Sequence, residues 1–479
     1  MAHCAQCGRE FSAGPADAPP LCPTCETEGG GARSEIKKDE AVYHQPPRIS
    51  INTLLIAANV VVYVVMVLRG IPPMHPSSEQ LLKWGANFGP WTLDNQPWRL
   101  FTCLFLHIGL VHLALNMWTL YNVGELAEAI YGQATFLAIY LLCGLAGSVG
   151  SIVRHSLGVS AGASGAIFGV AGALIATLLL GHFAIPRRVL RVTLVVLVVF
   201  AVYSLGAGFL NTGVDNGAHI GGFIAGLILG AVMARDYRHP SQPHSDSRAW
   251  LLPAMCVAIA ATFLSLRYVH APQVHAYKAE EALAKGNNSL ALAELSAALT
   301  RQPSVVLYTS QGDVYLRMKQ IDQAEASYKK AIALNAKDVV PRHRLADIYL
   351  RENKVEEARE VLQQITELQP NDALAYFQLA LILQNTGKHD DAVAAMRKAV
   401  AANPNFPPAQ FNLGLLEMQS KQYDAAIANF QQFAKLAPND PDAFQWLGNA
   451  YEAKGMEKEA QVAYAKLYEL RRARAPKQR

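Results

Sequence analysis

Charge is scarce in this sequence and nearly balanced. Only 17% of its 479 residues are charged, and 42 Lys and Arg against 38 Asp and Glu leave a formal net charge of +4. A protein that binds nucleic acid gathers basic residues on one surface, because it must neutralise phosphates, and often adds aromatic residues that stack on bases. No segment of the sequence has this pattern, which excludes nucleic acid as a predicted partner.

Cysteine is also scarce, with seven residues in the chain, and the first four stand in two Cys-x-x-Cys pairs separated by fourteen residues. They are Cys4, Cys7, Cys22 and Cys25. Four thiolates complete a tetrahedral zinc site and leave no position for a substrate, so we predict a structural zinc in a small zinc-ribbon-like module. A redox-active dithiol pair is the alternative. The remaining cysteines, Cys103, Cys143 and Cys256, lie in apolar segments and are predicted to be packing residues.

Apolar residues are abundant instead, at 51% of the chain, and they concentrate in seven runs long enough to cross a bilayer. The runs cover residues 52–69, 99–123, 133–153, 164–181, 189–208, 214–234 and 250–269. The first run follows about fifty mostly polar residues and lacks the short basic start of a signal peptide, so we predict an anchor that stays in the protein. The expected fold is all-α, beginning with a polytopic membrane helix bundle.

The Lys and Arg residues beside these runs predict the orientation of the bundle. Ten of them fall on the side of the N-terminus and five on the other side, which favours a cytoplasmic N-terminus. Seven spans then place everything after residue 270 outside. The run at 250–269 is the least certain to cross, because its alanine-rich middle is only moderately apolar; if it lies on the membrane, the rest of the chain faces the cytoplasm. Since no transit-type leader precedes the cysteines, we expect a bacterial inner membrane.

Two residue types that carry out nucleophilic catalysis lie inside these apolar runs. Ser164 stands between Gly162 and Gly165, and His219 precedes Gly222 by three residues. A polar or ionisable side chain in a lipid-spanning helix is expensive and is usually retained for function. Each motif alone is more often a packing feature of membrane helices. Together they indicate a site in which serine and histidine share a hydrogen bond, since the glycines at 222, 226 and 230 leave one helix face bare enough for close packing.

A third motif supplies hydrogen-bond donors. His112 and Asn116 are four residues apart and therefore lie on one face of a helix, where both can donate to a single point. Acyl transfer requires such donors, because its tetrahedral intermediate develops a negatively charged oxygen. His107 and these four residues all fall in the halves of their helices nearest one surface.

At these residues the chain resembles the rhomboid family of intramembrane serine proteases. The resemblance covers about residues 49–235 and rests on the Trp98-Arg99 pair, the His-x-x-x-Asn step, the Gly-x-Ser-Gly serine and the Ala-His-x-x-Gly histidine, which stand in family order. It implies that Ser164 is the nucleophile and His219 the general base, without an aspartate, and that His112, Asn116 and the Ser164 amide form the oxyanion hole. Supporting roles are implied for Gly162, Gly165, Trp98, Arg99, Glu128 and Gly222.

The resemblance also implies a structural pair and a reaction. Arg99 and Glu128 match a family pair that ties the first loop to the end of the second helix. The expected activity is that of an intramembrane serine endopeptidase, which cleaves peptide bonds in or next to transmembrane segments of protein substrates with no metal or organic cofactor in the chemistry. The alternative hypothesis is a catalytically silent membrane scaffold or adaptor that binds transmembrane clients and recruits soluble ones.

The last 200 residues or so repeat small residues and proline at an interval of 34. The repeated positions are Gly312, Ala346, Ala380, Gly414 and Gly448; Ala324, Ala358, Ala392, Ala426 and Ala460; and Pro370, Pro404 and Pro438. This pattern is similar to that of tetratricopeptide repeats, in which small residues stand where two helices cross. We predict an α-solenoid of six units, the first of them degenerate. We expect this solenoid to bind a protein or peptide partner. The alternative is that it is only a structural spacer.

These observations divide the chain into five predicted parts. They are the zinc-ribbon-like module at 1–28, a linker at 29–48, the rhomboid-like core at 49–235, a loop with the seventh span at 236–271, and the repeat solenoid at 272–474. The core and the extra span contact the lipid bilayer.

Overall fold

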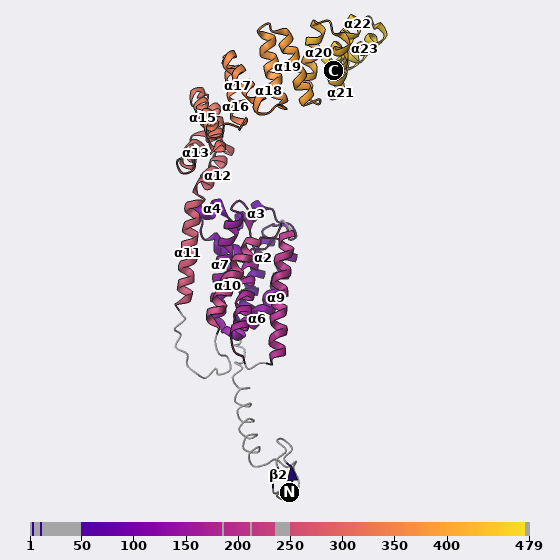
Figure 1. The fold of residues 1–479 in the computed structure, drawn as a ribbon. Coiled ribbons are helices and arrows are strands. Elements are labelled where there is room, and N and C mark those ends of the chain that lie inside the picture. Colours follow the sequence, from indigo (N-terminus) through magenta and orange to yellow (C-terminus); the bar gives the residue numbers. More distant parts are fainter. Residues whose placement is uncertain are drawn as a thin grey trace. The chain divides into compact units, whose positions relative to one another are not determined.

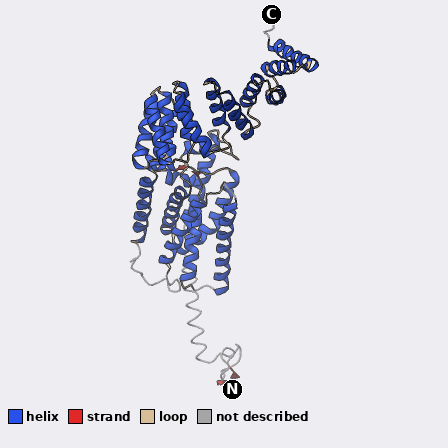
Figure 2. Ribbon diagram, turned by 45° about the horizontal axis from the view of Figure 1, so that its top comes forward, coloured by secondary structure: helices blue, strands red, loops and turns tan. Residues whose placement is uncertain are grey.

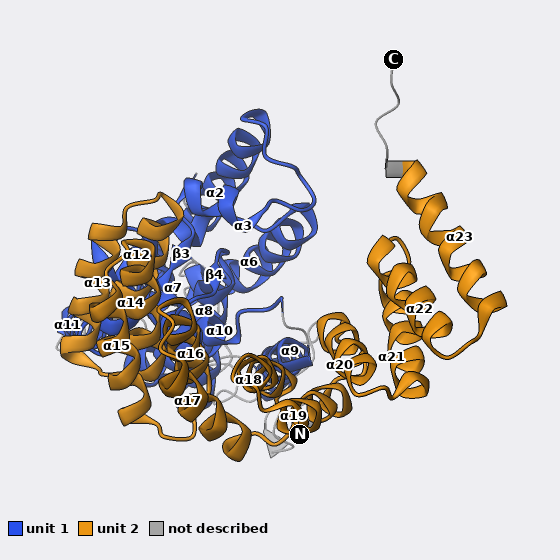
Figure 3. Cartoon of the chain, turned by 90° about the horizontal axis from the view of Figure 1, so that it is seen from above, with its two compact units in different colours: residues 1–274 blue, residues 275–479 orange. Residues whose placement is uncertain are grey.

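The computed structural model describes residues 2–3, 10–11, 49–183, 186–210, 213–234 and 250–474. The chain forms two compact units, Met1–Val274 and His275–Arg479 (Figure 3). Apart from four strands of two residues each, all the regular structure in the described ranges is helical (Figure 2). The all-α fold class is therefore confirmed. The four cysteines of the predicted zinc site lie outside the described residues, and the zinc-ribbon module stays a prediction.

The first unit contains the apolar helices and two small pairs of strands. β1 (Ala2–His3) pairs antiparallel with β2 (Glu10–Phe11), and β3 (Asn87–Phe88) pairs antiparallel with β4 (Val159–Ser160). The helices are α2 (Ile51–Leu68), α3 (Ser78–Trp84), α4 (Gly89–Asp94), α5 (Arg99–Thr102), the 3-10 helix η1 (Cys103–Phe105), α6 (Leu110–Tyr131), α7 (Gln133–Arg154), α8 (Ser164–Leu180), α9 (Arg187–Leu210), α10 (Asn216–Met233) and α11 (Leu251–Val269) (Figure 1).

The predicted spans match these helices with one exception. Within the described ranges, α2, α7, α9, α10 and α11 are long and apolar enough to cross a membrane, and α8 is a shorter apolar helix. The run at 99–123, predicted as a span, is not one continuous helix: the chain bends by 91° between Arg99–Phe105 and Leu110–Tyr131, so that α6 alone forms the long helix. Gly109 causes the break, because its φ of +109° suits glycine and a Cβ there would lie 2.3 Å from the carbonyl oxygen of Met74.

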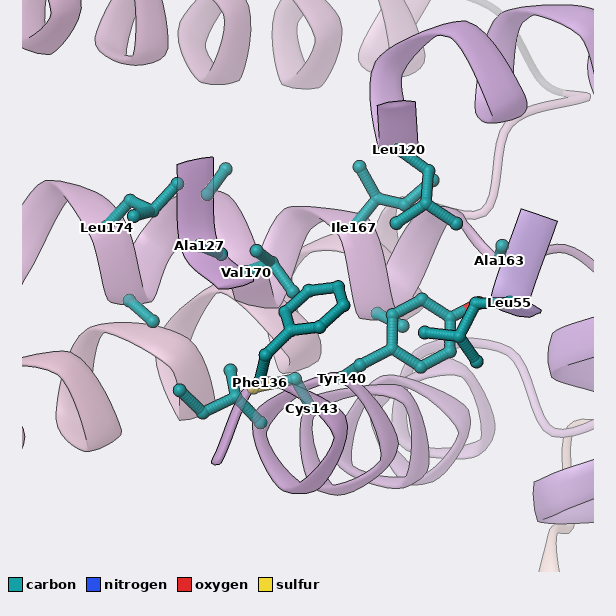
Figure 4. Close-up of a cluster of buried hydrophobic side chains, with 14 of the residues drawn as sticks. Leu55, Leu120, Ala127, Phe136, Tyr140, Cys143, Ala163, Ile167, Val170 and Leu174 are labelled. Carbon is teal, nitrogen blue, oxygen red and sulfur yellow. The ribbon is translucent and has the colours of Figure 1, made fainter. Parts of the chain in front are cut away.

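Helix α8 lies in the middle of this unit. Nearly all its residues are buried, and it contacts α6, α7, α9 and α10. Figure 4 shows the core around it, where Ile167, Val170 and Leu174 of α8 lie near Phe136 and Tyr140 of α7. A helix that is apolar on all sides is buried, so contacts with the surrounding helices hold it in place.

Helices α8 and α10 pack backbone against backbone. A Cβ added to Gly222, Gly226 or Gly230 would lie 2.0, 1.9 or 2.1 Å from a carbonyl oxygen of α8. These oxygens belong to Gly165, Gly169 and Ala173. Any side chain larger than hydrogen would separate the helices, so the predicted close approach along the glycine face of α10 is present.

The second unit is a series of helix pairs. Its helices are α12 (Ala271–Ala284), whose first four residues still belong to the first unit, α13 (Asn288–Arg301), α14 (Val305–Arg317), α15 (Ile321–Leu334), α16 (Val340–Arg351), α17 (Val355–Leu368), α18 (Ala373–Asn385), α19 (His389–Ala402), α20 (Pro407–Gln419), α21 (Tyr423–Leu436), α22 (Pro441–Ala453) and α23 (Glu457–Arg474). Each repeat contributes two helices, and from α13 on each helix contacts the next along the chain. The repeat solenoid is therefore confirmed.

The small residues at the 34-residue interval stand where the two helices of a repeat cross. A Cβ on Gly312, Gly414 or Gly448 would lie 2.5 to 2.6 Å from an aromatic ring on the second helix. The rings belong to Tyr328, Phe430 and Tyr464, each sixteen residues later. In the repeats α16–α17 and α18–α19 alanine takes the glycine position, and the partner sixteen residues later is Leu362 or Met396, also buried. Glycine thus accompanies an aromatic residue and alanine an aliphatic one.

Candidate active site

Ser164 and His219 meet at one end of the α8–α10 pair. Ser164 is the first residue of α8, and His219 lies in the first turn of α10. The Nε2 atom of His219 is 2.9 Å from the Oγ atom of Ser164, which is hydrogen-bonding distance. Because the glycine contacts fix the separation of the two helices, the same backbone packing that fills the core also sets this distance. The predicted serine and histidine are brought together.

An aromatic contact orients the His219 ring, and a cap fixes the helix turn that carries this residue. The ring of Phe168 stacks on the imidazole with centroids 4.3 Å apart and planes 13° from parallel. At the start of α10, the Asp215 carboxylate accepts a hydrogen bond from the Ala218 amide at 3.0 Å. The side chain of His219 is 8% exposed, so the imidazole is nearly enclosed. Phe168 was not among the predicted site residues, although it stands four residues after Ser164 and therefore on the same helix face.

The backbone before Ser164 requires glycine. Gly162 has a φ of +141°, and a Cβ there would lie 2.8 Å from Cε1 and 3.2 Å from Nε2 of His112. Its amide donates a hydrogen bond to the carbonyl oxygen of Cys103 at 2.9 Å. These two constraints place the His112 ring directly beside the turn that carries the serine.

Three hydrogen-bond donors lie at the same end of the bundle as this turn. The Ile108 amide donates to Nδ1 of His112 at 3.3 Å, which leaves the ring proton on Nε2, the nitrogen that faces Gly162. The Asn116 side-chain amide donates one hydrogen to the His112 carbonyl oxygen at 2.9 Å and keeps a second one free to donate. The Ser164 amide lies in the first turn of α8, where an N–H has no helical carbonyl partner. This arrangement suits an oxyanion hole.

His107 occupies the bend between η1 and α6. It is completely buried, and neither of its ring nitrogens has a hydrogen-bond partner among the described residues. Its ring centroid is 5.3 Å from that of His112. The polar residues at 107, 112, 116, 164 and 219 therefore gather at one end of the bundle, where α6, α8 and α10 begin.

Arg99 and Glu128 do not form the predicted pair. The Arg99 guanidinium donates to the carbonyl oxygens of Leu82 and Ala86 at 2.8 and 2.9 Å, and it lies over the rings of Trp91 and Trp98. It therefore stabilises the segment that contains α3, α4 and α5. The prediction is wrong because α6, with 22 residues, separates the two side chains: Arg99 precedes this helix, and Glu128 stands in its last turn.

Glu128 instead holds the start of α2. Its carboxylate accepts hydrogen bonds from the Ser50 hydroxyl at 2.7 Å, from the amides of Ile51 and Asn52, and from the side chain of Gln133. The first amides of a helix lack helical partners. A carboxylate beside them accepts their hydrogen bonds, and its negative charge interacts favourably with the helix dipole. Glu128 therefore supports the bundle at the end opposite to the serine.

A metal site is not formed by the residues that the structure covers. No group of three or more His, Cys, Asp or Glu side chains within those ranges is arranged to hold an ion. The zinc prediction rests on cysteines outside them.

Known proteins resemble both parts of the chain. The family model described as Rhomboid domain matches residues 94–236, and models of tetratricopeptide repeats match segments between 278 and 474. Rhomboid protease GluP of Bacillus subtilis (strain 168) is 36% identical over 203 residues, which are 42% of this chain and 38% of GluP. RHOMBOID-like protein 7 of Arabidopsis thaliana is 32% identical over 257 residues, which are 48% of this chain and 80% of that protein.

Solved structures resemble the repeats. A crystal structure of MamA protein is 26% identical, covers 36% of this chain and 96% of its own, and has a TM-score of 0.33. YrrB, described as a TPR protein with an unusual peptide-binding site, is 18% identical, covers 38% of this chain and 93% of its own, and has a TM-score of 0.34. The match to most of RHOMBOID-like protein 7, the Rhomboid domain and the apolar helices lead to one conclusion: this chain is an integral membrane protein that belongs to the rhomboid family and carries C-terminal tetratricopeptide repeats.

Proposed function

We propose that this protein is an intramembrane serine endopeptidase that hydrolyses peptide bonds in or next to transmembrane segments of protein substrates. The observation that carries the proposal is the 2.9 Å contact between Ser164 Oγ and His219 Nε2, made inside a bundle of apolar helices. Nothing in the packing of α8 against α10 requires these two polar side chains at their contact. A polar pair in such surroundings is costly to retain without a function.

The geometry supports a two-step acyl transfer. Ser164 Oγ attacks the carbonyl carbon of the scissile bond while His219 Nε2 takes its proton. The oxygen of that carbonyl becomes negatively charged beside His112, Asn116 and the Ser164 amide, each of which is worth about 2.7 to 4 kcal/mol in the barrier if it donates as an oxyanion-hole group. The C–N bond then breaks as His219 returns the proton to the leaving amine. A water molecule, activated by the same histidine, hydrolyses the acyl ester and releases Ser164.

Variants of the dyad test the proposal. Ser164→Ala and His219→Ala should each reduce cleavage of a transmembrane reporter substrate to background, because nucleophile and base act as one unit. Ser265→Ala, on an exposed position of α11, is the matched control and should cleave at the wild-type rate. Cleavage is measured in proteoliposomes by gel electrophoresis. Substantial turnover by either dyad variant would remove the assignment and favour the scaffold hypothesis.

We further propose that the repeats and the site open on the same, outer side of a bacterial cell membrane, with the N-terminus cytoplasmic. The charge bias beside the spans supports this orientation. So does the packing of α11: its last turns, with Phe263 and Leu266, pack in one cluster with Leu100, near the start of the segment that reaches Cys103. Trp250 and Tyr268, both exposed, stand near its two ends, as aromatic residues do at membrane interfaces.

A protease added to intact spheroplasts tests this topology. It should digest the region after residue 270 and leave the N-terminal residues intact. Protection of the repeats would show that α11 does not cross. On the outer side the repeats would bind protein segments and raise the local concentration of substrates or partners.

We also propose that Cys4, Cys7, Cys22 and Cys25 bind one structural zinc ion in an N-terminal module. The support is the four-thiolate spacing alone. Metal analysis of the purified protein should find one zinc per chain and none in a Cys7→Ser/Cys22→Ser variant, which should keep its protease activity. The five-part division with boundaries at 28, 48, 235 and 271 is proposed with it.

A further inference from the structure

The loop at 155–158, between α7 and β4, is held from two sides. On one side, a Cβ added to Gly89 would lie 2.3 Å from the carbonyl oxygen of Ser156, so the start of α4 packs directly on this loop. On the other side, the Ser156 hydroxyl donates a hydrogen bond to Oε1 of Gln273 at 3.2 Å. His270 Nδ1 is 2.7 Å from the same oxygen. Gln273 belongs to the first turn of α12, directly after α11.

The same loop leads into the proposed active site. β4 follows it and pairs with β3, with Val159 opposite Phe88 and Ser160 opposite Asn87. Gly162 comes two residues after β4, and its amide binds the Cys103 carbonyl. Ser164 then begins α8. A shift of the loop therefore moves the turn that presents Gly162 to His112 and the Ser164 amide to the oxyanion position.

Apolar packing supports the same connection. Leu93 of α4, Leu100 of α5, Val149 and Ile152 of α7, and Val274 of α12 form one buried cluster, with Phe263 and Leu266 of α11 packed against it. No residue of α11 is fully buried, although Leu252, Met255 and Ile259 in its earlier turns pack against the central core. The cluster at its end is the contact that reaches α4 and α5. Leu100 precedes Cys103 by one turn, so this cluster supports the carbonyl that binds Gly162 as well.

We propose that the junction of α11 and α12 is a positioning element of the active site. Gln273 holds the 155–158 loop through Ser156, while Leu266 and Val274 hold α4 and α5. Together they fix the turn that carries Ser164. The inference rests on the proposed function, and it assigns to the seventh helix a part in catalysis beyond anchoring the repeats. Gln273 touches none of the reacting atoms, so it is a positioning residue.

Two substitutions of Gln273 separate its hydrogen bond from its volume. Gln273→Met keeps the length of the side chain and removes the acceptor, whereas Gln273→Glu keeps an acceptor oxygen for Ser156. In the full-length protein, Gln273→Met should lower kcat for a transmembrane reporter and the rate of fluorophosphonate labelling of Ser164 by about three- to tenfold, the effect of one hydrogen bond. KM and Tm should stay near wild type, and Gln273→Glu should restore both rates.

The result that overturns the proposal is equally specific. Wild-type labelling and kcat in Gln273→Met would show that the hydrogen bond positions nothing. If both variants are labelled more slowly and both also have a lower Tm, Gln273 has a merely structural role.

A second pair of variants tests the apolar contact. Leu266→Ala removes a side chain that packs on the cluster, and Leu264→Ala removes one that is 61% exposed on the same helix. The first should lower the labelling rate by a similar factor, and the second should leave it unchanged. Equal rates in the two variants would contradict a role for the end of α11.

Hydrogen exchange distinguishes failure of this inference from failure of the proposed function. Amides of residues 155–163 should exchange faster in Gln273→Met than in wild type, whether or not the protein cleaves any substrate. If wild type shows neither cleavage nor labelling but the exchange rises, the protease proposal fails and the junction still holds the loop. If the exchange is unchanged, the positioning proposal fails.

Discussion

The membrane unit and the repeat unit both bring two helices together at glycine, yet the contacts differ in kind. In the α8–α10 pair the glycines face backbone carbonyl oxygens at 1.9 to 2.1 Å from a notional Cβ. In the repeats the glycines face aromatic side chains at 2.5 to 2.6 Å. A side chain can be replaced by a smaller one. Where alanine occupies the glycine position, Leu362 or Met396 stands in place of the aromatic residue. A backbone carbonyl cannot be replaced.

This difference explains why one contact can fix a catalytic distance and the other can vary between repeats. The separation of α8 and α10 is set by atoms common to every residue, so it does not change unless a glycine changes. The distance between Ser164 and His219 is therefore fixed as well. The repeats need only fill the volume between two helices, and several pairs of side chains fill it.

The largest expected effect follows from breaking the backbone contact. Gly226→Leu should abolish cleavage of the transmembrane reporter, because a Cβ 1.9 Å from the Gly169 oxygen forces the helices apart. Gly206→Leu on α9 is the matched control, since nothing lies within 4 Å of a Cβ there. Cleavage is measured for both at equal amounts of membrane-inserted protein. Wild-type activity in Gly226→Leu would contradict the role given to the glycine face.

A smaller effect is expected at a single donor of the oxyanion hole. Asn116→Ala should lower kcat by about 10²-fold or more, with a smaller change in KM, because the donor acts mostly in the transition state. Asn122→Ala is the matched control. Both asparagines donate to the carbonyl four residues earlier on α6, at 2.9 and 2.7 Å, but Asn122 is exposed on the helix. In steady-state kinetics, the kcat of Asn122→Ala should equal that of the wild type. Equal losses of kcat in the two variants would make Asn116 a local helix contact only.

The smallest effect concerns a repeat. Gly414→Ala should destabilise the α20–α21 pair by about 1 to 3 kcal/mol, because its Cβ would lie 2.6 Å from the Phe430 ring. Adding Phe430→Leu should recover most of the loss, since the double variant reproduces the Ala346–Leu362 combination. Hydrogen exchange of α20 and α21 in the full-length protein measures both. A double variant less stable than the sum of its parts would show that size matching does not govern these crossings.

The sequence alone predicts much of this molecule, for physical reasons that differ by region. Ser164, His219, His112 and Asn116 could be recognised because polar side chains are conspicuous in apolar helices and because helical spacing places them on defined faces. The repeats could be recognised because every unit meets the same packing constraint. Phe168 could have been found from its position one turn after the serine.

Other features depend on contacts that hydropathy does not record. The segment from 104 to 111 is mostly apolar, so the bend at Gly109 is invisible until the carbonyl of Met74 is placed beside it. The resemblance to the rhomboid family implies a pair of Arg99 and Glu128, yet each side chain binds uncharged groups instead, backbone carbonyls for the guanidinium and amides for the carboxylate. The contact of Gln273 with Ser156 joins residues 117 positions apart, which no local pattern signals.

Covalent labelling tests the Ser164–His219 dyad by itself, because it reports the nucleophile without a substrate. The protein in proteoliposomes is treated with a fluorophosphonate, and the adduct is located by mass spectrometry. We expect an adduct on Ser164 in the wild type, none in Ser164→Ala, and labelling close to background in His219→Ala, since the serine needs its base to become nucleophilic. An unlabelled wild type, or labelling that survives His219→Ala at the wild-type rate, would contradict the Ser164–His219 dyad.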